Sequence, residues 1–198
     1  MNKSRMKIWE LSLLLALCFS LCLGTWAQAK QSSISGALVR LHVIAVSDDD
    51  YEQALKLRVR DEVLGYISPK LHGTKTAGQA QSIITSELGG IKAAAESAAE
   101  GRTVTVTLSE EYYPTRDYEG FSLPAGKYRS LRVILGEGEG HNWWCVVFPP
   151  LCISAAEQEQ AVESMSEDMR GIVTEDDGYV YKFRIIELWG ELMELIDA

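Results

Sequence analysis

The sequence has few of the residues from which metal and catalytic sites are commonly built. Among 198 residues there are four cysteines and three histidines, and the cysteines form no C-x-x-C pair. His141, Cys145 and Cys152 lie close together in the sequence, but a structural zinc site needs four ligands. The sequence therefore predicts no metal site and no cofactor.

Positive charge is also scarce. The chain has 19 lysines and arginines against 28 aspartates and glutamates, a formal net charge of −9. A nucleic-acid-binding protein needs basic patches to neutralise phosphates, and electrostatic docking on anionic lipid needs clusters of basic residues. The sequence also has no internal repeat and no low-complexity segment. The acidic residues therefore indicate a solvated surface and no nucleic-acid partner.

Residues 1–29 have the organisation of a signal peptide. Three basic residues among the first seven precede the uncharged apolar run 11–23, and Ala27-Gln28-Ala29 follows as a small-x-small cleavage site. This pattern predicts cleavage between Ala29 and Lys30 and export of the mature chain. The alternative is an uncleaved membrane anchor, although the apolar run is shorter than the roughly 20 residues that a spanning helix needs.

The rest of the chain predicts a short disordered lead, residues 30–37, and one domain, residues 38–198. Alternation of apolar side chains predicts strands at 38–46, 103–109, 128–135 and 142–148, with an extended aromatic segment at 112–118. Helical periodicity predicts one helix that stops at Ser68-Pro69, a second over 76–100 with a break at Gly89-Gly90, and two more over 154–169 and 180–196.

This order of elements predicts an α+β fold. We expect a mixed β-sheet of about four or five strands, with two helices after strand one and two C-terminal helices. The first strand reaches its neighbours through a helical crossover, so one parallel pair of strands is expected.

Residues 136–152 concentrate scarce residue types. Gly136, Gly138 and Gly140 predict a tight turn that joins the flanking strands as a β-hairpin. The spacing also matches G-x-G-x-G, but Glu137 and Glu139 would repel a phosphate, and a strand follows where a phosphate loop needs a helix. Two glutamates in one turn are more often solvated than paired as catalytic carboxylates.

Trp143 and Trp144 are neighbours on a strand and therefore point to opposite faces of the sheet. One is expected to enter the core, and the other lies under a helix or is exposed. An exposed tryptophan beside a turn is a good anchor for a partner. The candidate binding residues are His141, Asn142, Trp143, Trp144, Pro149 and Pro150.

Cys145 has two further interpretations. In an exported chain, Cys145 and Cys152 form a disulfide or remain as two buried thiols. A nucleophilic Cys145 would need a neighbouring base, either His141 or His42, and would make the protein an envelope hydrolase. Four residues along a strand separate His141 from Cys145 by about 13 Å, so we do not expect an enzyme.

Several segments of the mature chain match one family. They are Leu41-His42-Val43-Ile44-Ala45 and the segments at 47–48, 53–57, 59–61, 124–128, 131–133 and 136–152. With these segments the chain resembles the stage II sporulation protein R family of endospore-forming bacteria. The run from Asn142 to Cys152 is the most specific part of the resemblance.

The resemblance implies a signalling role rather than catalysis. Such a protein is made in the forespore and secreted into the intermembrane space. There it activates the membrane-embedded sporulation sigma-E factor processing peptidase, which cleaves the precursor of the mother-cell sigma factor. No small-molecule substrate is expected. The envelope hydrolase, and a structural envelope domain without a signalling role, are the alternatives.

Overall fold

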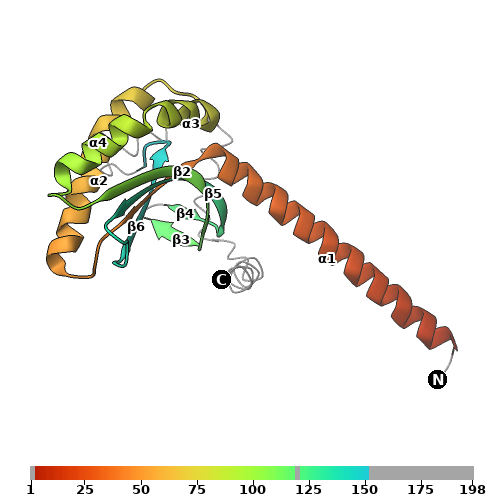
Figure 1. Ribbon diagram of the computed structural model, residues 1–198. Coiled ribbons are helices and arrows are strands. Elements are labelled where there is room, and N and C mark those ends of the chain that lie inside the picture. The colour runs from red at the N-terminus through yellow and green to blue at the C-terminus, as the bar shows by residue number, and fades with distance from the viewer. Residues whose placement is uncertain (1–2, 119–120, 152–198) are drawn as a thin grey trace. The chain divides into compact units, whose positions relative to one another are not determined.

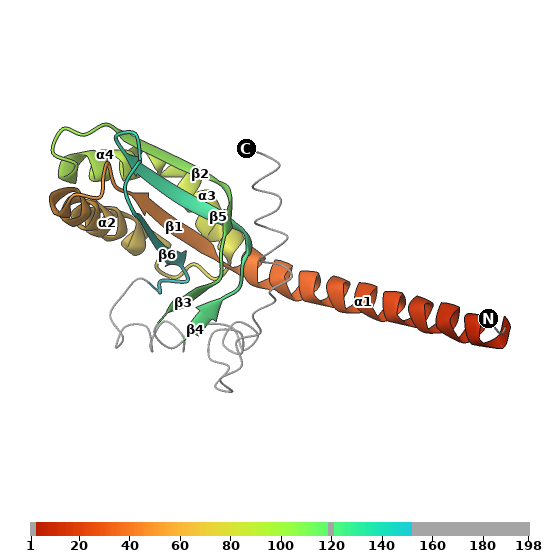
Figure 2. The ribbon, with the colours of Figure 1, turned by 90° about the horizontal axis from the view of Figure 1, so that it is seen from below.

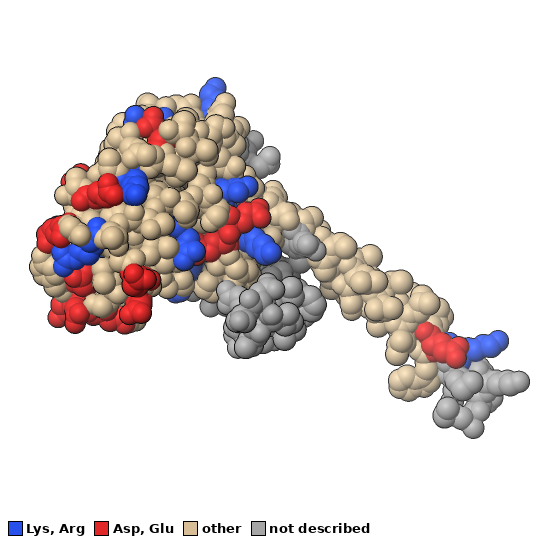
Figure 3. Space-filling view, viewed as in Figure 1, with Lys and Arg blue, Asp and Glu red and all other residues tan. Residues whose placement is uncertain are grey.

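The structure is a computed structural model that describes residues 3–118 and 121–151. The chain divides into two compact units, Met1–Ile34 and Ser35–Ala198. Helix α1 (Lys3–Ala37) carries its charged atoms near its amino-terminal end (Figure 3), and the segment Lys7–Ala37 is long and apolar enough to cross a membrane. A signal peptide and a membrane anchor share this property. The helix includes residues 30–37, for which we predicted a disordered lead.

A four-stranded mixed sheet forms the centre of the second unit. Its order is β2-β5-β1-β6, with bounds β1 Val39–Ile44, β2 Val104–Tyr113, β5 Gly126–Leu135 and β6 Asn142–Phe148. Strand β1 is parallel to β5 and antiparallel to β6. The predicted α+β class and the parallel pair are confirmed. The two predicted C-terminal helices lie outside the described residues.

Three helices follow β1 and cover one face of this sheet (Figures 1 and 2): α2 (Asp50–Leu71), α3 (Ala77–Ser86) and α4 (Leu88–Ala98). Alternate residues of β1 and β5 point toward them, and the apolar residues of the helices meet these side chains in one core. Fully buried members include Leu41, Val43, Val59, Val63, Ile84, Ile91, Leu131 and Val133.

Two helix boundaries differ from the sequence prediction. Helix α2 does not stop at Ser68-Pro69 but continues to Leu71, with Pro69 inside its last turn. The proline removes one N–H from the helix, and the helix ends two residues later. The predicted helix 76–100 breaks at Glu87 rather than at Gly89-Gly90, so three helices replace the expected two. Gly90 has a packing role instead, since a Cβ there would lie 1.8 Å from Tyr66 Oη.

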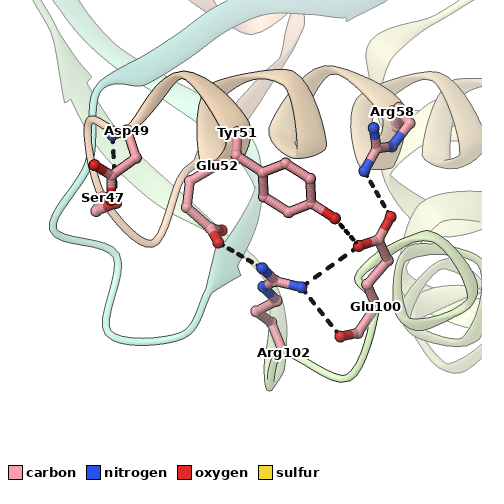
Figure 4. Close-up of polar contacts among 7 residues, drawn as sticks. All are labelled: Ser47, Asp49, Tyr51, Glu52, Arg58, Glu100 and Arg102. Atoms are coloured by element: carbon pink, nitrogen blue, oxygen red, sulfur yellow. Dashed lines mark hydrogen bonds and ion pairs between the residues drawn. The ribbon is translucent and has the colours of Figure 1, made fainter.

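Polar contacts tie the start of α2 to the loop between α4 and β2 (Figure 4). Arg102 Nη2 lies 2.6 Å from Glu52 Oε1, and Arg58 Nη2 lies 2.6 Å from Glu100 Oε1. Tyr51 donates its hydroxyl to the same Glu100 carboxylate. The Tyr51 hydrogen bond and the two arginine charges hold the pKa of Glu100 below its ordinary value. These contacts fix the amino-terminal end of α2 against the β2 edge of the sheet.

Aromatic residues after β2 form a second, smaller sheet of β3 (Arg116–Tyr118) and β4 (Phe121–Leu123). The predicted extended segment 112–118 is thus divided, because β2 runs through Tyr113 and Pro114 separates it from β3. Tyr118 donates its hydroxyl to the Trp144 carbonyl oxygen, 3.5 Å away. This contact places the small sheet near the face of the main sheet that α2, α3 and α4 leave uncovered.

Candidate functional site

The glycine turn, residues 136–140, does not close a β-hairpin, and that prediction was wrong. Strands β5 and β6 do not pair, because β1 lies between them and bonds to both. The turn must therefore pass over the end of β1, where the backbones come close. A Cβ on Gly140 would lie 2.3 Å from the Ser47 carbonyl oxygen, and one on Gly138 would lie 2.7 Å from Ile134 Cγ2.

The exit of this turn is clamped to the loop after β1. The His141 backbone N–H donates to Asp48 Oδ1 at 2.6 Å, and the His141 ring pairs with the same carboxylate. Lys56 Nζ donates to the His141 carbonyl oxygen at 2.8 Å and to Gln53 Oε1 at 2.6 Å. The His141 backbone bond lowers the pKa of Asp48, and burial lowers the pKa of Lys56. The His141 backbone is thereby fixed while its side chain stays 76 % exposed.

The two tryptophans point to opposite faces, as predicted. Trp143 pairs with Val43 on the helix side and remains 37 % exposed. The central carbon of the Arg60 guanidinium lies 4.6 Å from the centre of its ring. Trp144 pairs with His42 on the other side and is half-buried, with the Arg116 guanidinium 3.7 Å from its ring. Trp143 therefore offers more surface to a partner.

The remaining candidates divide between the two ends of β6. Asn142 is exposed and adjoins His141, whereas Pro149 is buried and Pro150 is exposed beyond the far end of the strand. At about 3.3 Å per residue, β6 spans roughly 20 Å from Asn142 to Phe148, and the prolines follow its far end. The structure thus brings together His141, Asn142 and Trp143, which we name the β6 tip, and does not bring the prolines to them.

Neither histidine is placed to activate Cys145. Cys145 pairs with Leu41 and packs in the helix-side core, whereas His42 points to the opposite face of the sheet. His141 lies four residues away and is paired with Asp48. The Cys145 sulfur is disulfide-bonded. Its predicted partner, Cys152, lies outside the described residues, so that pairing stays a prediction.

Sequence reasoning missed a polar and aromatic cluster on the face opposite α2, α3 and α4. His42 is 4 % exposed; its Nδ1 lies 2.8 Å from Glu111 Oε1 and its Nε2 lies 2.8 Å from Asn142 Oδ1. Arg40 is fully buried and lies 3.9 Å from the centre of the Tyr113 ring. The available signal was the placement of two polar residues, Arg40 and His42, on one face of a central strand.

The Glu111 carboxylate makes the stability that this cluster contributes depend on pH. Burial opposes its ionisation, but the hydrogen bond from His42 and the charge of Arg132 outweigh burial and hold the pKa of Glu111 below its ordinary value. A lowered carboxyl pKa contributes stability above the unfolded pKa of about 4.3 and loses it as pH falls through the folded value. The native state should therefore lose this contribution below about pH 5.

We expect Glu111→Gln to lower the free energy of unfolding by about 1–2 kcal/mol at pH 7, because a charged acceptor of a buried histidine is lost. The variant should also lose less stability than the unmodified chain between pH 7 and pH 4. Urea unfolding at both pH values measures this, with Glu110→Gln, an exposed neighbour, as control. Equal losses in the unmodified chain and Glu111→Gln would contradict the assignment.

Known proteins match this chain over the part that forms the main sheet and the glycine turn. The family model described as stage II sporulation protein R matches residues 35–158. Stage II sporulation protein R of Bacillus subtilis (strain 168) is 35% identical over 133 residues, which are 65% of this chain and 59% of that protein, so the match covers less than two thirds of the relative's length. No solved structure matches the chain. The chain belongs to the stage II sporulation protein R family.

Proposed function

We propose that this chain is an exported signal of sporulation. It is secreted by the forespore into the intermembrane space, where it activates the membrane-embedded peptidase that processes the sigma-E precursor. The observation that carries this proposal is the family match, which includes β1, the three helices and the whole glycine turn. The apolar helix α1 supports export, with cleavage between Ala29 and Lys30.

The β6 tip is the part of the domain best suited to contact that peptidase. Trp143 is an exposed aromatic ring with a cation over its face, and such residues often dominate binding energy. The bonds from Asp48 and Lys56 hold the His141 backbone before any partner arrives, which lowers the entropy cost of binding. By binding the active arrangement of the peptidase more tightly than the inactive one, the tip would shift its population.

Deletion of the gene in its spore-forming host tests the proposal. We expect the sigma-E precursor to accumulate unprocessed in early sporulation, as followed by immunoblot, and to mature again when the full chain is restored. A second complementation with residues 1–29 deleted should fail, because the protein would stay inside the forespore. Normal processing of the sigma-E precursor in the deletion strain would contradict the signalling role and favour a structural envelope domain.

The proposed bridge between Cys145 and Cys152 makes a separate prediction. Cys145→Ser, Cys152→Ser and the double variant should all lose the same stability, about 2–3 kcal/mol for so short a loop. Thermal unfolding of the secreted proteins, with and without reductant, measures this. Two unbridged thiols would give unequal, additive losses, and a catalytic Cys145 would abolish signalling in Cys145→Ser while leaving Cys152→Ser active.

A further inference from the structure

Strand β2 lies at the edge of the main sheet. Among residues 3–118 and 121–151, only β5 pairs with it (Figure 2). The ten residues Val104–Tyr113 pair with β5 without a register shift, and they include no lysine and no proline. Proteins commonly protect an edge strand by making it short or by giving it a lysine, a proline or a bulge. Strand β2 has none of these four features, so its edge can accept a further strand.

The outer edge of β2 presents the backbone groups of every second residue. The Gly136 N–H donates to the Thr103 carbonyl oxygen at 2.9 Å, and the register of β2 with β5 sets these two residues opposite each other. Because backbone groups alternate in direction along a strand, the next residues that bond to β5 are Thr105, Thr107 and Ser109. The N–H and C=O groups of the intervening residues therefore point away from β5; these residues are Val104, Val106, Leu108 and Glu110.

The side chains of β2 leave apolar surface at this edge. Val106 and Leu108 face the helices but are only partly buried against the core. Thr105 and Thr107 lie on the other face of the sheet and are exposed. Helix α4, which contacts β2, consists mainly of glycine and alanine, and small side chains allow a second helix to pack closely beside it. A strand added at this edge would cover Val106 and Leu108.

Strand β2 is complementary to itself when a second copy runs antiparallel to it about a two-fold axis at Thr107. In that register Val106 lies opposite the partner's Leu108, and Thr107 lies opposite the partner's Thr107. Apolar pairs and threonine pairs across strands are both favourable. Since Val104 also lies opposite the partner's Glu110, the outward backbone groups of the two strands meet and form about eight hydrogen bonds.

The charges of β2 favour the same antiparallel arrangement. The two acids of the strand, Glu110 and Glu111, are adjacent at its carboxyl end. An antiparallel second copy places the two pairs of acids at opposite ends of the joint, whereas a parallel copy would set them side by side and would be destabilised by repulsion. A contact in which the same surface serves both subunits is the usual form of a two-fold dimer.

We propose that two copies of this chain associate edge to edge through β2, antiparallel about Thr107, and join their four-stranded sheets into one. The two-fold axis is perpendicular to the sheet, so the helices of both copies lie on the same face. Because two strands bury little surface, the dimer is weak and depends on protein concentration. This association does not depend on the proposed signalling function.

Disulfide trapping tests the dimer and its register together. Thr107→Cys places two thiols opposite each other in a pair that exchanges no backbone hydrogen bonds, where the Cα atoms lie about 4.5 Å apart, a separation that a disulfide spans. Thr105→Cys is the matched control on the same strand and face, since its two thiols would lie about 13 Å apart. Removal of the signal segment removes Cys18 and Cys22, and Cys145 is already disulfide-bonded.

Under a mild oxidant, the secreted Thr107→Cys protein should form the cross-linked dimer at least about tenfold faster than Thr105→Cys, as followed on non-reducing gels. Sedimentation equilibrium of the unmodified secreted chain over a series of concentrations should show a monomer–dimer equilibrium. Either of two results would overturn the proposal. One is an equal rate of cross-linking in the two variants; the other is an unmodified chain that is monomeric at every concentration, as it would be if another segment covered the edge of β2.

Discussion

Replacing Gly140 by alanine should strongly destabilise the folded domain. The new Cβ would lie 2.3 Å from the Ser47 carbonyl oxygen and 2.9 Å from the Ala45 Cβ. Both atoms are held in place by the chain just after β1, and neither can move away as the end of a long side chain can. The bond from the Gly140 N–H to the Ala45 carbonyl oxygen, 3.0 Å long, would also be displaced.

The expected loss is about 3 kcal/mol or more, at the upper end for an overpacked site. This is a large part of the 5–15 kcal/mol by which a domain is stable. Urea unfolding of the secreted protein measures the loss. Gly65→Ala is the matched control, since Gly65 lies in α2 with nothing within 4 Å of the added Cβ; it should stabilise the helix by up to about 1 kcal/mol. A Gly140→Ala protein as stable as the unmodified chain would refute the crossing geometry.

Trp143→Ala should reduce processing of the sigma-E precursor by about thirtyfold while the domain stays folded. An aromatic anchor at the centre of an interface contributes about 2 kcal/mol or more, which corresponds to that factor in affinity. The fold should tolerate the change, because Trp143 stands at the surface on the edge strand β6. Quantitative immunoblots of the precursor against the amount of secreted protein measure the effect.

Two variants control this experiment. Trp143→Phe keeps an aromatic face for Arg60 and should retain much of the activity. Lys75→Ala changes an exposed residue in the loop before α3 and should signal normally. If folded, secreted Trp143→Ala protein supports normal processing, the β6 tip is not the contact surface, and the exposed Pro150 becomes the next candidate.

The strands were predictable because their patterns are local. In β1, alternation places Leu41 and Val43 on one face and Arg40 and His42 on the other. The structure confirms this division, since Leu41 and Val43 pack in the core beneath the helices and Arg40 and His42 do not. The end of β2 was predicted too early, because Tyr112 and Tyr113 were assigned to a separate aromatic segment. In the structure, hydrogen bonding to β5 continues the strand through Tyr113.

The candidate site was only partly predictable. The sequence placed His141, Asn142, Trp143 and Trp144 in one run, and alternation separated the two tryptophans. It could not reveal that Asp48 and Lys56 hold the turn, because these residues are 93 and 85 positions from His141. Nor could it pair His42 with Glu111, which lies in another strand.

By itself, the sequence determined the apolar amino-terminal segment, the α+β class, the approximate positions of the strands of the main sheet, and the family, because each depends on local periodicity or on short motifs. The tertiary structure decided that β1 separates β5 from β6, that Gly140 must pass over Ser47, and that Arg40 is buried among tyrosines. Two glycine-linked strands have the same sequence pattern whether or not a third strand lies between them. Only the competition of distant strands for the same backbone hydrogen bonds settles the order.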